Sequence, residues 1–229
     1  MNFDLQQKIL NLLLSLPAFV IAFTIHEFAH AFAADRLGDD TPRRMGRLTL
    51  DPLAHLDPFG SAMFVLTHLV GFGLGWAKPV PFNPRNLRHR ARDTMLIAVA
   101  GPISNILQVP IWVALLFGFR TLAQNAGWYG DFTSDKMTFA SLVTTMLAQG
   151  IIVNIVLAAF NMLPFPPLDG HYILEGLGPP FIAEFFHSIR PYSFMILIAM
   201  SYFGLFSYVI RPFAMFGGHL IDFAMGGGF

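Results

Sequence analysis

The sequence contains no cysteine and few charged residues, and both absences narrow its class. Without cysteine there is no disulfide and no thiolate metal site, so any bound metal would need His, Asp or Glu ligands. Charged residues make up 12% of the 229 residues, against roughly 25% in soluble domains. Basic and acidic residues balance at 14 each, which gives nucleic-acid binding no electrostatic support. We therefore expect no nucleic-acid partner.

Hydrophobic side chains replace the missing charge. They form 55% of the chain, the mean hydropathy is +0.57, and Phe alone occurs 25 times. A transmembrane helix needs about 20 mostly apolar residues. Such runs lie at 8–35, 94–121, 138–162 and 192–210. We predict an all-α integral membrane protein, a polytopic helix bundle that forms one membrane-embedded domain over residues 1–229.

The first apolar run contains an unusual set of ionisable residues. Residues 26–30 read HEFAH, and two His side chains four positions apart lie on one face of a helix, where both can bind one metal ion. Glu27, about 100° further round the helix, can reach a metal-bound water without taking a ligand position. Ionisable groups at bilayer depth cost about 2.5–3.5 kcal/mol each, so they usually serve a function. The plain alternative is that His26 and His30 are polar residues that face other helices.

Basic residues flank a glycine-containing apolar stretch at 58–76. Four arginines lie between residues 36 and 47, and five Lys or Arg residues lie between 78 and 92. The positive-inside rule places both segments on the cytoplasmic side. The stretch 58–76 would then be re-entrant or lie along the surface, because a crossing would put one basic segment outside. The HEFAH motif would lie near the cytoplasmic end of its helix.

A third metal ligand is needed, since catalytic zinc sites normally have three protein ligands and an open position. Three prolines between 164 and 167 break the helix that ends near Met162, and Asp169 follows them. Gly170 allows a close approach of the backbone. From these residues alone, Asp169 serves equally well as a third ligand or as the N-cap of the next helix.

Three segments, in this order, resemble the signatures of the site-2 protease family. They are HEFAH at 26–30, AGPISN at 100–105, and the stretch from Asn161 to the PLDG sequence at 167–170. The stretch GWAKPVPFNP at 75–84 resembles the compact bacterial branch, which has no PDZ or CBS domain. The ordered set is more specific than any one motif.

The resemblance assigns a role to each matched residue. It implies that His26, His30 and Asp169 bind one Zn²⁺ per chain, and that Glu27 is the general base that activates the zinc-bound water. It also implies that Asn161 helps to polarise the carbonyl of the scissile peptide bond. The protein would be a zinc metalloendopeptidase.

The resemblance covers about residues 20–178 and sets the expected organisation. It implies a three-helix catalytic core within about 8–178, and the apolar run at about 192–210 adds a C-terminal membrane helix. Alternating residues at 47–50 favour a short membrane-associated strand that would pair with an unwound substrate. The partners would be the lipid bilayer and a transmembrane protein or peptide substrate, cleaved within or near its membrane segment. The expected location is the bacterial inner membrane, with the site toward the cytoplasm.

Other interpretations stay open at this point. The chain would serve as a scaffold if it were an inactive family member, and it would be a metal-binding or metal-transport protein if the site lined a path. No internal repeat of the kind that transporters usually show is present. Asn105 fits a helix-packing hydrogen bond better than direct chemistry, and Gly101 and Ser104 fit small packing residues. His68 fits a buried structural residue, and His171 fits an interfacial side chain better than a partner of the metal.

Overall fold

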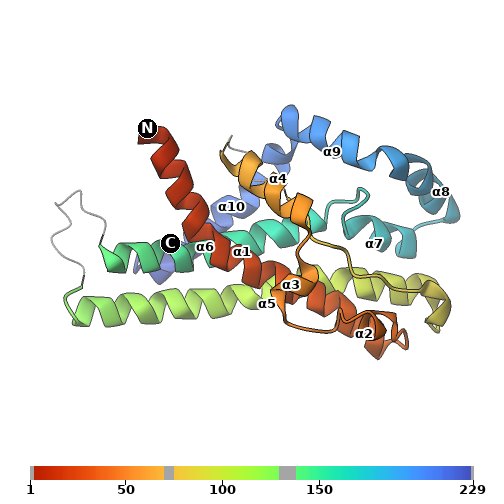
Figure 1. Cartoon of the computed structure of the whole chain (residues 1–229), viewed down its shortest axis with the longest axis horizontal. Coiled ribbons are helices and arrows are strands. Elements are labelled where there is room, and N and C mark those ends of the chain that lie inside the picture. The colour runs from red at the N-terminus through yellow and green to blue at the C-terminus, as the bar shows by residue number, and fades with distance from the viewer. Residues whose placement is uncertain (1–2, 70–74, 129–137, 228–229) are drawn as a thin grey trace.

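The computed structural model describes residues 3–69, 75–128 and 138–227. Three long helices dominate it (Figure 1): α1 (Phe3–Arg36), α5 (Arg90–Asn125) and α6 (Phe139–Asn161). Each packs against the other two. At 1.5 Å per residue their lengths are roughly 51, 54 and 35 Å, which exceeds the hydrocarbon thickness of about 30 Å. All three are long and apolar enough to cross a membrane, which fits an all-α membrane helix bundle and confirms the first three predicted apolar helices.

Local sequence determines both ends of α6. The Thr138 hydroxyl accepts a hydrogen bond from the Ser141 backbone N–H at 3.1 Å, and the Ser141 hydroxyl accepts one from the Thr138 N–H at 3.0 Å. This reciprocal capping box starts the helix. The helix ends at Asn161, as the prolines that follow predicted. Gly150 in its middle leaves room for Trp112 of α5, since a Cβ there would lie 2.2 Å from the indole ring.

The C-terminal part differs from the prediction of one membrane helix at 192–210. Four helices are present: α7 (Gly170–Leu177), α8 (Pro180–Ile189), α9 (Ser193–Tyr202) and α10 (Leu205–Ala224). A short 3₁₀ turn joins α8 to α9. Gly204 has a left-handed φ of 68°, and the path bends by 70° between the helix pair before it and α10 after it. A residue with positive φ cannot continue an α-helix, so the apolar run is split there. The C-terminal membrane helix predicted at about 192–210 is therefore broken at Gly204, and its crossing of the membrane stays a prediction.

The segment between α1 and α5 contains short helices and loops. They are α2 (Thr41–Arg44), α3 (Pro52–His55), α4 (Pro58–Leu69) and a 3₁₀ turn, η1 (Pro84–Asn86). The strand predicted at 47–50 is absent, and the only β-pairing among the described residues is an isolated antiparallel bridge between Leu56 and Ala77. Arg47 is buried while Leu50 is 59% exposed, which is the reverse of the burial that a half-buried strand would need. The strand prediction was therefore wrong.

Helix α4 occupies the first part of the stretch 58–76. It has 12 residues, so it is roughly 18 Å long and too short to cross a bilayer alone. It packs against α1, where the rings of Phe19 and Phe64 stack at 4.1 Å between centroids. Residues 70–74 lie outside the described part of the chain, so the re-entrant path of 58–76 stays a prediction.

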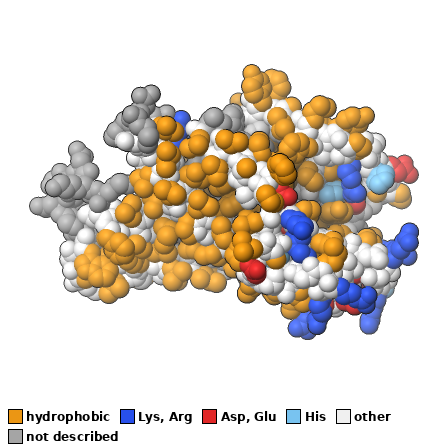
Figure 2. Space-filling model, viewed as in Figure 1, with side chains coloured by type: hydrophobic (Ala, Val, Ile, Leu, Met, Phe, Trp, Pro, Cys, Tyr) orange, Lys and Arg blue, Asp and Glu red, His pale blue; other side chains and the backbone are white. Residues whose placement is uncertain are grey.

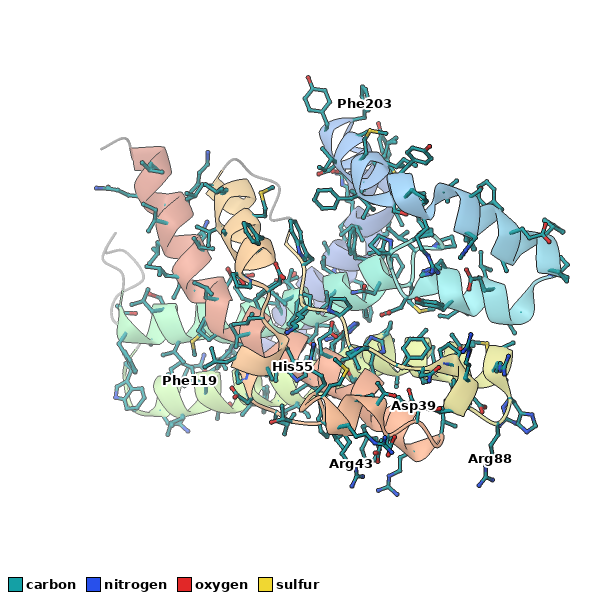
Figure 3. All side chains as sticks on the ribbon, turned by 45° about the vertical axis from the view of Figure 1, so that its right-hand side comes forward. Asp39, Arg43, His55, Arg88, Phe119 and Phe203 are labelled. Carbon is teal, nitrogen blue, oxygen red and sulfur yellow. The ribbon has the colours of Figure 1, made fainter. Side chains whose placement is uncertain are left out.

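The charged side chains gather at one end of the molecule. Figure 2 shows most Lys and Arg side chains of this face at the end where α1 finishes and α5 begins. Figure 3 shows Asp39, Arg43 and Arg88 toward this end and Phe119 of α5 toward the other. The C-terminal end of α6 and α7 lie toward the charged end as well (Figure 1).

Candidate metal centre

Helix α1 brings two histidine rings together inside the helix bundle. His26 and His30 are 3% and 8% exposed, and their rings lie edge to face with centroids 4.7 Å apart. The two Nε2 atoms are 3.1 Å from each other. This is the geometry that the spacing of residues 26–30 predicts, with both rings directed to one point beside the helix.

Asp169 reaches the same point from the segment that follows α6. Its Oδ2 atom lies 3.3 Å from Nε2 of His26 and 3.3 Å from Nε2 of His30. Asp169 does occupy the N-cap position of α7, but its side chain caps no backbone N–H. Gly170 permits the tight path, since a Cβ there would lie 2.4 Å from the carbonyl oxygens of Met162 and Leu163. The geometry thus favours the ligand interpretation of Asp169 over the capping one.

The outer nitrogens of both rings are held by hydrogen bonds. Nδ1 of His26 donates to Oδ1 of Asn105 at 2.7 Å, and Nδ1 of His30 donates to the Ile97 carbonyl at 2.7 Å. In a neutral ring that carries its proton on Nδ1, Nε2 holds a lone pair. Two lone pairs and a carboxylate oxygen therefore converge, and they repel one another unless a proton or a cation lies among them.

The chemistry of this donor set fits a metal ion. The three ligand atoms lie within 4.8 Å of one another, and Oδ2 of Asp169 is buried without a hydrogen-bond partner. Two imidazole nitrogens and one carboxylate are a ligand set typical of catalytic zinc, with a fourth position left open.

Gly101 of α5 provides the space that the two rings occupy. A Cβ at this position would lie 2.4 Å from Nε2 of His30 and 2.6 Å from Cε1 of His26. The Ser104 hydroxyl donates to the Gly101 carbonyl at 2.7 Å, within the same helix. Both residues therefore have the packing role that the sequence suggested.

The two residues with predicted catalytic roles are placed differently. Glu27 is 7% exposed on α1 between the two histidines in sequence, and among the described residues its carboxylate makes no hydrogen bond or ion pair. Asn161 is the last residue of α6, and its amide Nδ2 donates to the Leu157 carbonyl of its own helix at 3.0 Å. No contact joins Asn161 to the histidines in the described part of the chain. The roles of both residues stay predictions.

A buried asparagine that the sequence analysis missed lies behind the centre. Asn154 of α6 is fully buried, and its Oδ1 accepts a hydrogen bond from Nδ2 of Asn105 at 2.9 Å. Asn105, also fully buried, makes the helix-packing hydrogen bond that was expected, but its partner is the candidate ligand His26. A polar side chain in an apolar helix, two turns before Asn161, was the signal that could have identified Asn154.

The remaining histidines do not join the centre. His171 is 1% exposed, so its interpretation as an interfacial side chain was wrong, and its Nδ1 donates to the Leu168 carbonyl. His55 is 1% exposed and bonds to the Thr49 carbonyl at 2.8 Å. His68 belongs to α4, but its side chain lies outside the described part of the structure. Among the described residues, only His26, His30 and Asp169 form a potential metal-binding group.

Comparison with known proteins identifies relatives by sequence but no solved structure that matches the chain. The chain is 35% identical over 198 residues to "Putative zinc metalloprotease YwhC" of Bacillus subtilis (strain 168), covering 84% of this chain and 82% of the relative. It is 24% identical over 188 residues to "Putative zinc metalloprotease Rip2" of Mycolicibacterium smegmatis, covering 82% and 66%. The protein of the same name in Mycobacterium tuberculosis H37Rv is 27% identical over 160 residues, covering 70% and 55%. No family model and no solved structure matches the chain.

Proposed function

The chain belongs to the family of YwhC and Rip2, the compact, site-2 protease-like zinc metalloproteases, and we propose that it cleaves peptide bonds within or near the transmembrane segments of membrane proteins. The observation that carries the proposal is the convergence of His26, His30 and Asp169. The two histidines and Glu27 belong to α1, a helix long and apolar enough to cross a membrane.

His26, His30 and Asp169 hold one zinc ion in this proposal. When bound, zinc lowers the pKa of a coordinated water to about 7 and polarises the carbonyl of the peptide bond. A bound cation would satisfy the buried oxygen of Asp169, which lacks a hydrogen-bond partner, and would remove the repulsion between the three donor atoms. The hydrogen bonds on the two Nδ1 atoms keep both rings oriented toward the ion.

Glu27 moves the proton. It removes a proton from the attacking water and delivers it to the nitrogen of the leaving amine, which a carboxylate can do when no other group occupies its oxygens. Its burial and the absence of a hydrogen-bond partner among the described residues support this role. Asn161 has a second amide hydrogen beyond the one given to Leu157, and this hydrogen is proposed to stabilise the oxygen of the scissile carbonyl.

The surroundings of the centre favour a substrate that lies in the membrane. The centre lies among α1, α5 and α6, which in the described part of the chain are long and apolar enough to span a bilayer. A transmembrane helix shields its own peptide bonds, so the substrate has to unwind locally before attack. The basic residues at the nearby end of the molecule favour a site toward the cytoplasmic side, by the positive-inside rule.

The first test compares zinc content and cleavage in wild type and Glu27→Gln, purified in detergent without chelators. We expect about one zinc per chain in both, and a loss of cleavage of about 10²–10⁴-fold in Glu27→Gln with a generic single-span substrate. Glu175→Gln is the matched control, because Glu175 lies on α7 beside Arg190 instead of the histidines.

Each outcome of this test has a definite meaning. Equal cleavage by Glu27→Gln and wild type would contradict the role of Glu27. Zinc in both proteins with cleavage in neither, over a panel of membrane substrates, would favour a scaffold. Wild type without zinc would remove the basis of the proposal.

A further inference from the structure

A chain of buried amides crosses the three long helices and ends at one of the candidate ligands. It runs from Asn154 on α6 to Asn105 on α5 and then to His26 on α1. The two asparagines are fully buried and His26 is 3% exposed. Each asparagine also donates to a backbone carbonyl. Because a carbonyl can only accept a hydrogen bond, this contact determines which way each side-chain amide is turned.

The orientation begins at Gly150. Its carbonyl accepts a hydrogen bond from Nδ2 of Asn154 at 2.8 Å, so Oδ1 of Asn154 has to face Asn105. Nδ2 of Asn105 donates to Oδ1 of Asn154 at 2.9 Å and to the Ala22 carbonyl at 3.2 Å. The Oδ1 atom of Asn105 is therefore directed to Nδ1 of His26, which has to carry a proton.

The two histidines differ in how this proton is fixed. For His30 the acceptor is the Ile97 carbonyl, a backbone atom whose identity no side chain controls. For His26 the acceptor is an amide that would offer the wrong atom if it turned over. A reversed Asn105 would present an N–H group to Nδ1 of His26, which would favour the proton on Nε2 and block metal binding there.

We propose that Asn154 is a positioning residue that acts through Asn105 to hold His26 in the tautomer that binds metal. The inference rests on the proposed zinc site and deepens it. Asn154 touches neither metal ligand directly, so its effect on the metal has to pass through Asn105.

Zinc affinity, measured by chelator competition on purified metal-free protein, tests the inference without relying on activity. Asn154→Leu is expected to bind zinc about 10–100-fold more weakly than wild type, the usual effect of losing an outer partner of a metal ligand. Gln108→Leu is the matched control and is expected to bind as wild type does. Gln108 is a buried amide on α5 that bonds to the Ser104 carbonyl and reaches no ligand.

A double-mutant cycle separates positioning from general packing. If Asn154 acts only through Asn105, the double variant Asn105→Leu/Asn154→Leu binds zinc no more weakly than Asn105→Leu alone. Multiplied losses in the double variant would overturn the inference, and so would wild-type affinity in Asn154→Leu.

Two further readouts keep the test decisive if a leucine variant fails to fold. Nitrogen NMR of ¹⁵N-histidine in wild type, assigned with His26→Ala, is expected to show a proton on Nδ1 of His26. A bare Nδ1 would overturn the inference. Wild type that binds no zinc would overturn the metal site and the inference together, whereas tight zinc binding with unchanged Asn154→Leu affinity overturns the inference alone.

Discussion

The two histidine rings of the centre are constrained by groups that belong to α5. Asn105 and Ile97 of α5 hold the outer nitrogens of the histidines, and Gly101 of the same helix lies against their rings. These three positions follow a spacing of four residues, so one face of α5 supplies all of them. A helix face that both orients the ligands and leaves space for them tolerates little change.

Gly101→Ala should abolish metal binding while the protein still folds. The new methyl group would meet Nε2 of His30, the atom that binds the metal, so the ring has to turn away. We expect the zinc content to fall below about a tenth of that of wild type, since a displaced ligand costs at least the 10–100-fold of a lost outer partner. Elemental analysis of the purified protein measures this directly.

The control lies further along the same helix. Gly118 is exposed, and a Cβ there would meet no atom within 4 Å. Gly118→Ala should therefore keep its zinc and gain a little stability, about 0.5–1 kcal/mol by helix propensity. Full zinc occupancy in Gly101→Ala would contradict the packing around the histidines.

The sequence predicted the part of the metal centre that depends on residue spacing within one segment. His26 and His30 share a helix face by arithmetic, and the structure adds only their mutual distance. For Asp169 the sequence left two equal interpretations, a metal ligand and the N-cap of α7. Which one holds depends on how segments that are distant in the sequence pack. Asn154 was missed for the same reason, since its importance comes from facing Asn105 across two helices.

At the scale of elements, side chains hold together the loops between α1 and α5 where a strand was expected. The Arg47 guanidinium donates to the carbonyls of Lys78 and Pro79, which joins the loop after α2 to the loop before η1. Alternating residues predict a strand only when a partner strand takes up the backbone hydrogen bonds. Here the buried side chain of Arg47 donates hydrogen bonds to the carbonyls of the neighbouring segment instead.

Asp39 is a second such connection, and Asp39→Asn should destabilise the fold. Its carboxylate accepts hydrogen bonds from the backbone and hydroxyl of Thr41, from the Asn83 N–H and from the Asn86 amide. An amide has one acceptor oxygen where the carboxylate has two, so some of these donors lose their partner in the buried position of residue 39. We expect a loss of about 1–3 kcal/mol in the free energy of unfolding, measured by denaturation in detergent.

Acid provides an independent check on Asp39. Burial opposes its ionisation, but the hydrogen bonds from Thr41, Asn83 and Asn86 outweigh this and hold the pKa of Asp39 below its usual value. Its contribution is therefore complete at neutral pH and is lost as the pH falls through this lowered pKa. Asp40→Asn is the control, since Asp40 is half exposed in a pair with Arg44 and should contribute less than about 1 kcal/mol. Equal effects of the two substitutions would contradict the prediction.

At the scale of the whole molecule, charge and hydrophobicity are separated along the long helices. Most basic side chains on the face in Figure 2 lie where α1 ends and α5 begins, and Figure 3 shows Phe119 toward the far end of α5. Composition predicted the membrane class and the long apolar runs predicted the three long helices, because both depend on sums over many residues. The break at Gly204 escaped prediction because one glycine in an apolar run is as compatible with a helix as with a turn.

The orientation in the membrane can be measured with unusually little background, because the chain has no cysteine of its own. Single cysteines are introduced at Arg88 before α5, at Asn125 at its end, and at Met45 after α1, all three exposed. They are then labelled with a membrane-impermeant maleimide in spheroplasts and in inverted vesicles. We expect Asn125→Cys to react in spheroplasts, and Arg88→Cys and Met45→Cys in inverted vesicles, because the positive-inside rule assigns the basic segments to the cytoplasm.

The comparison of Met45→Cys with Arg88→Cys decides the path of the stretch 58–76. Labelling from the same side means an even number of crossings between them, which agrees with a helix α4 that is too short to span and with a re-entrant path. Labelling from opposite sides would show that 58–76 crosses the membrane and would contradict this path. If Arg88→Cys and Asn125→Cys reacted from one side, α5 would not span, and a membrane-embedded position of the histidines would lose its support.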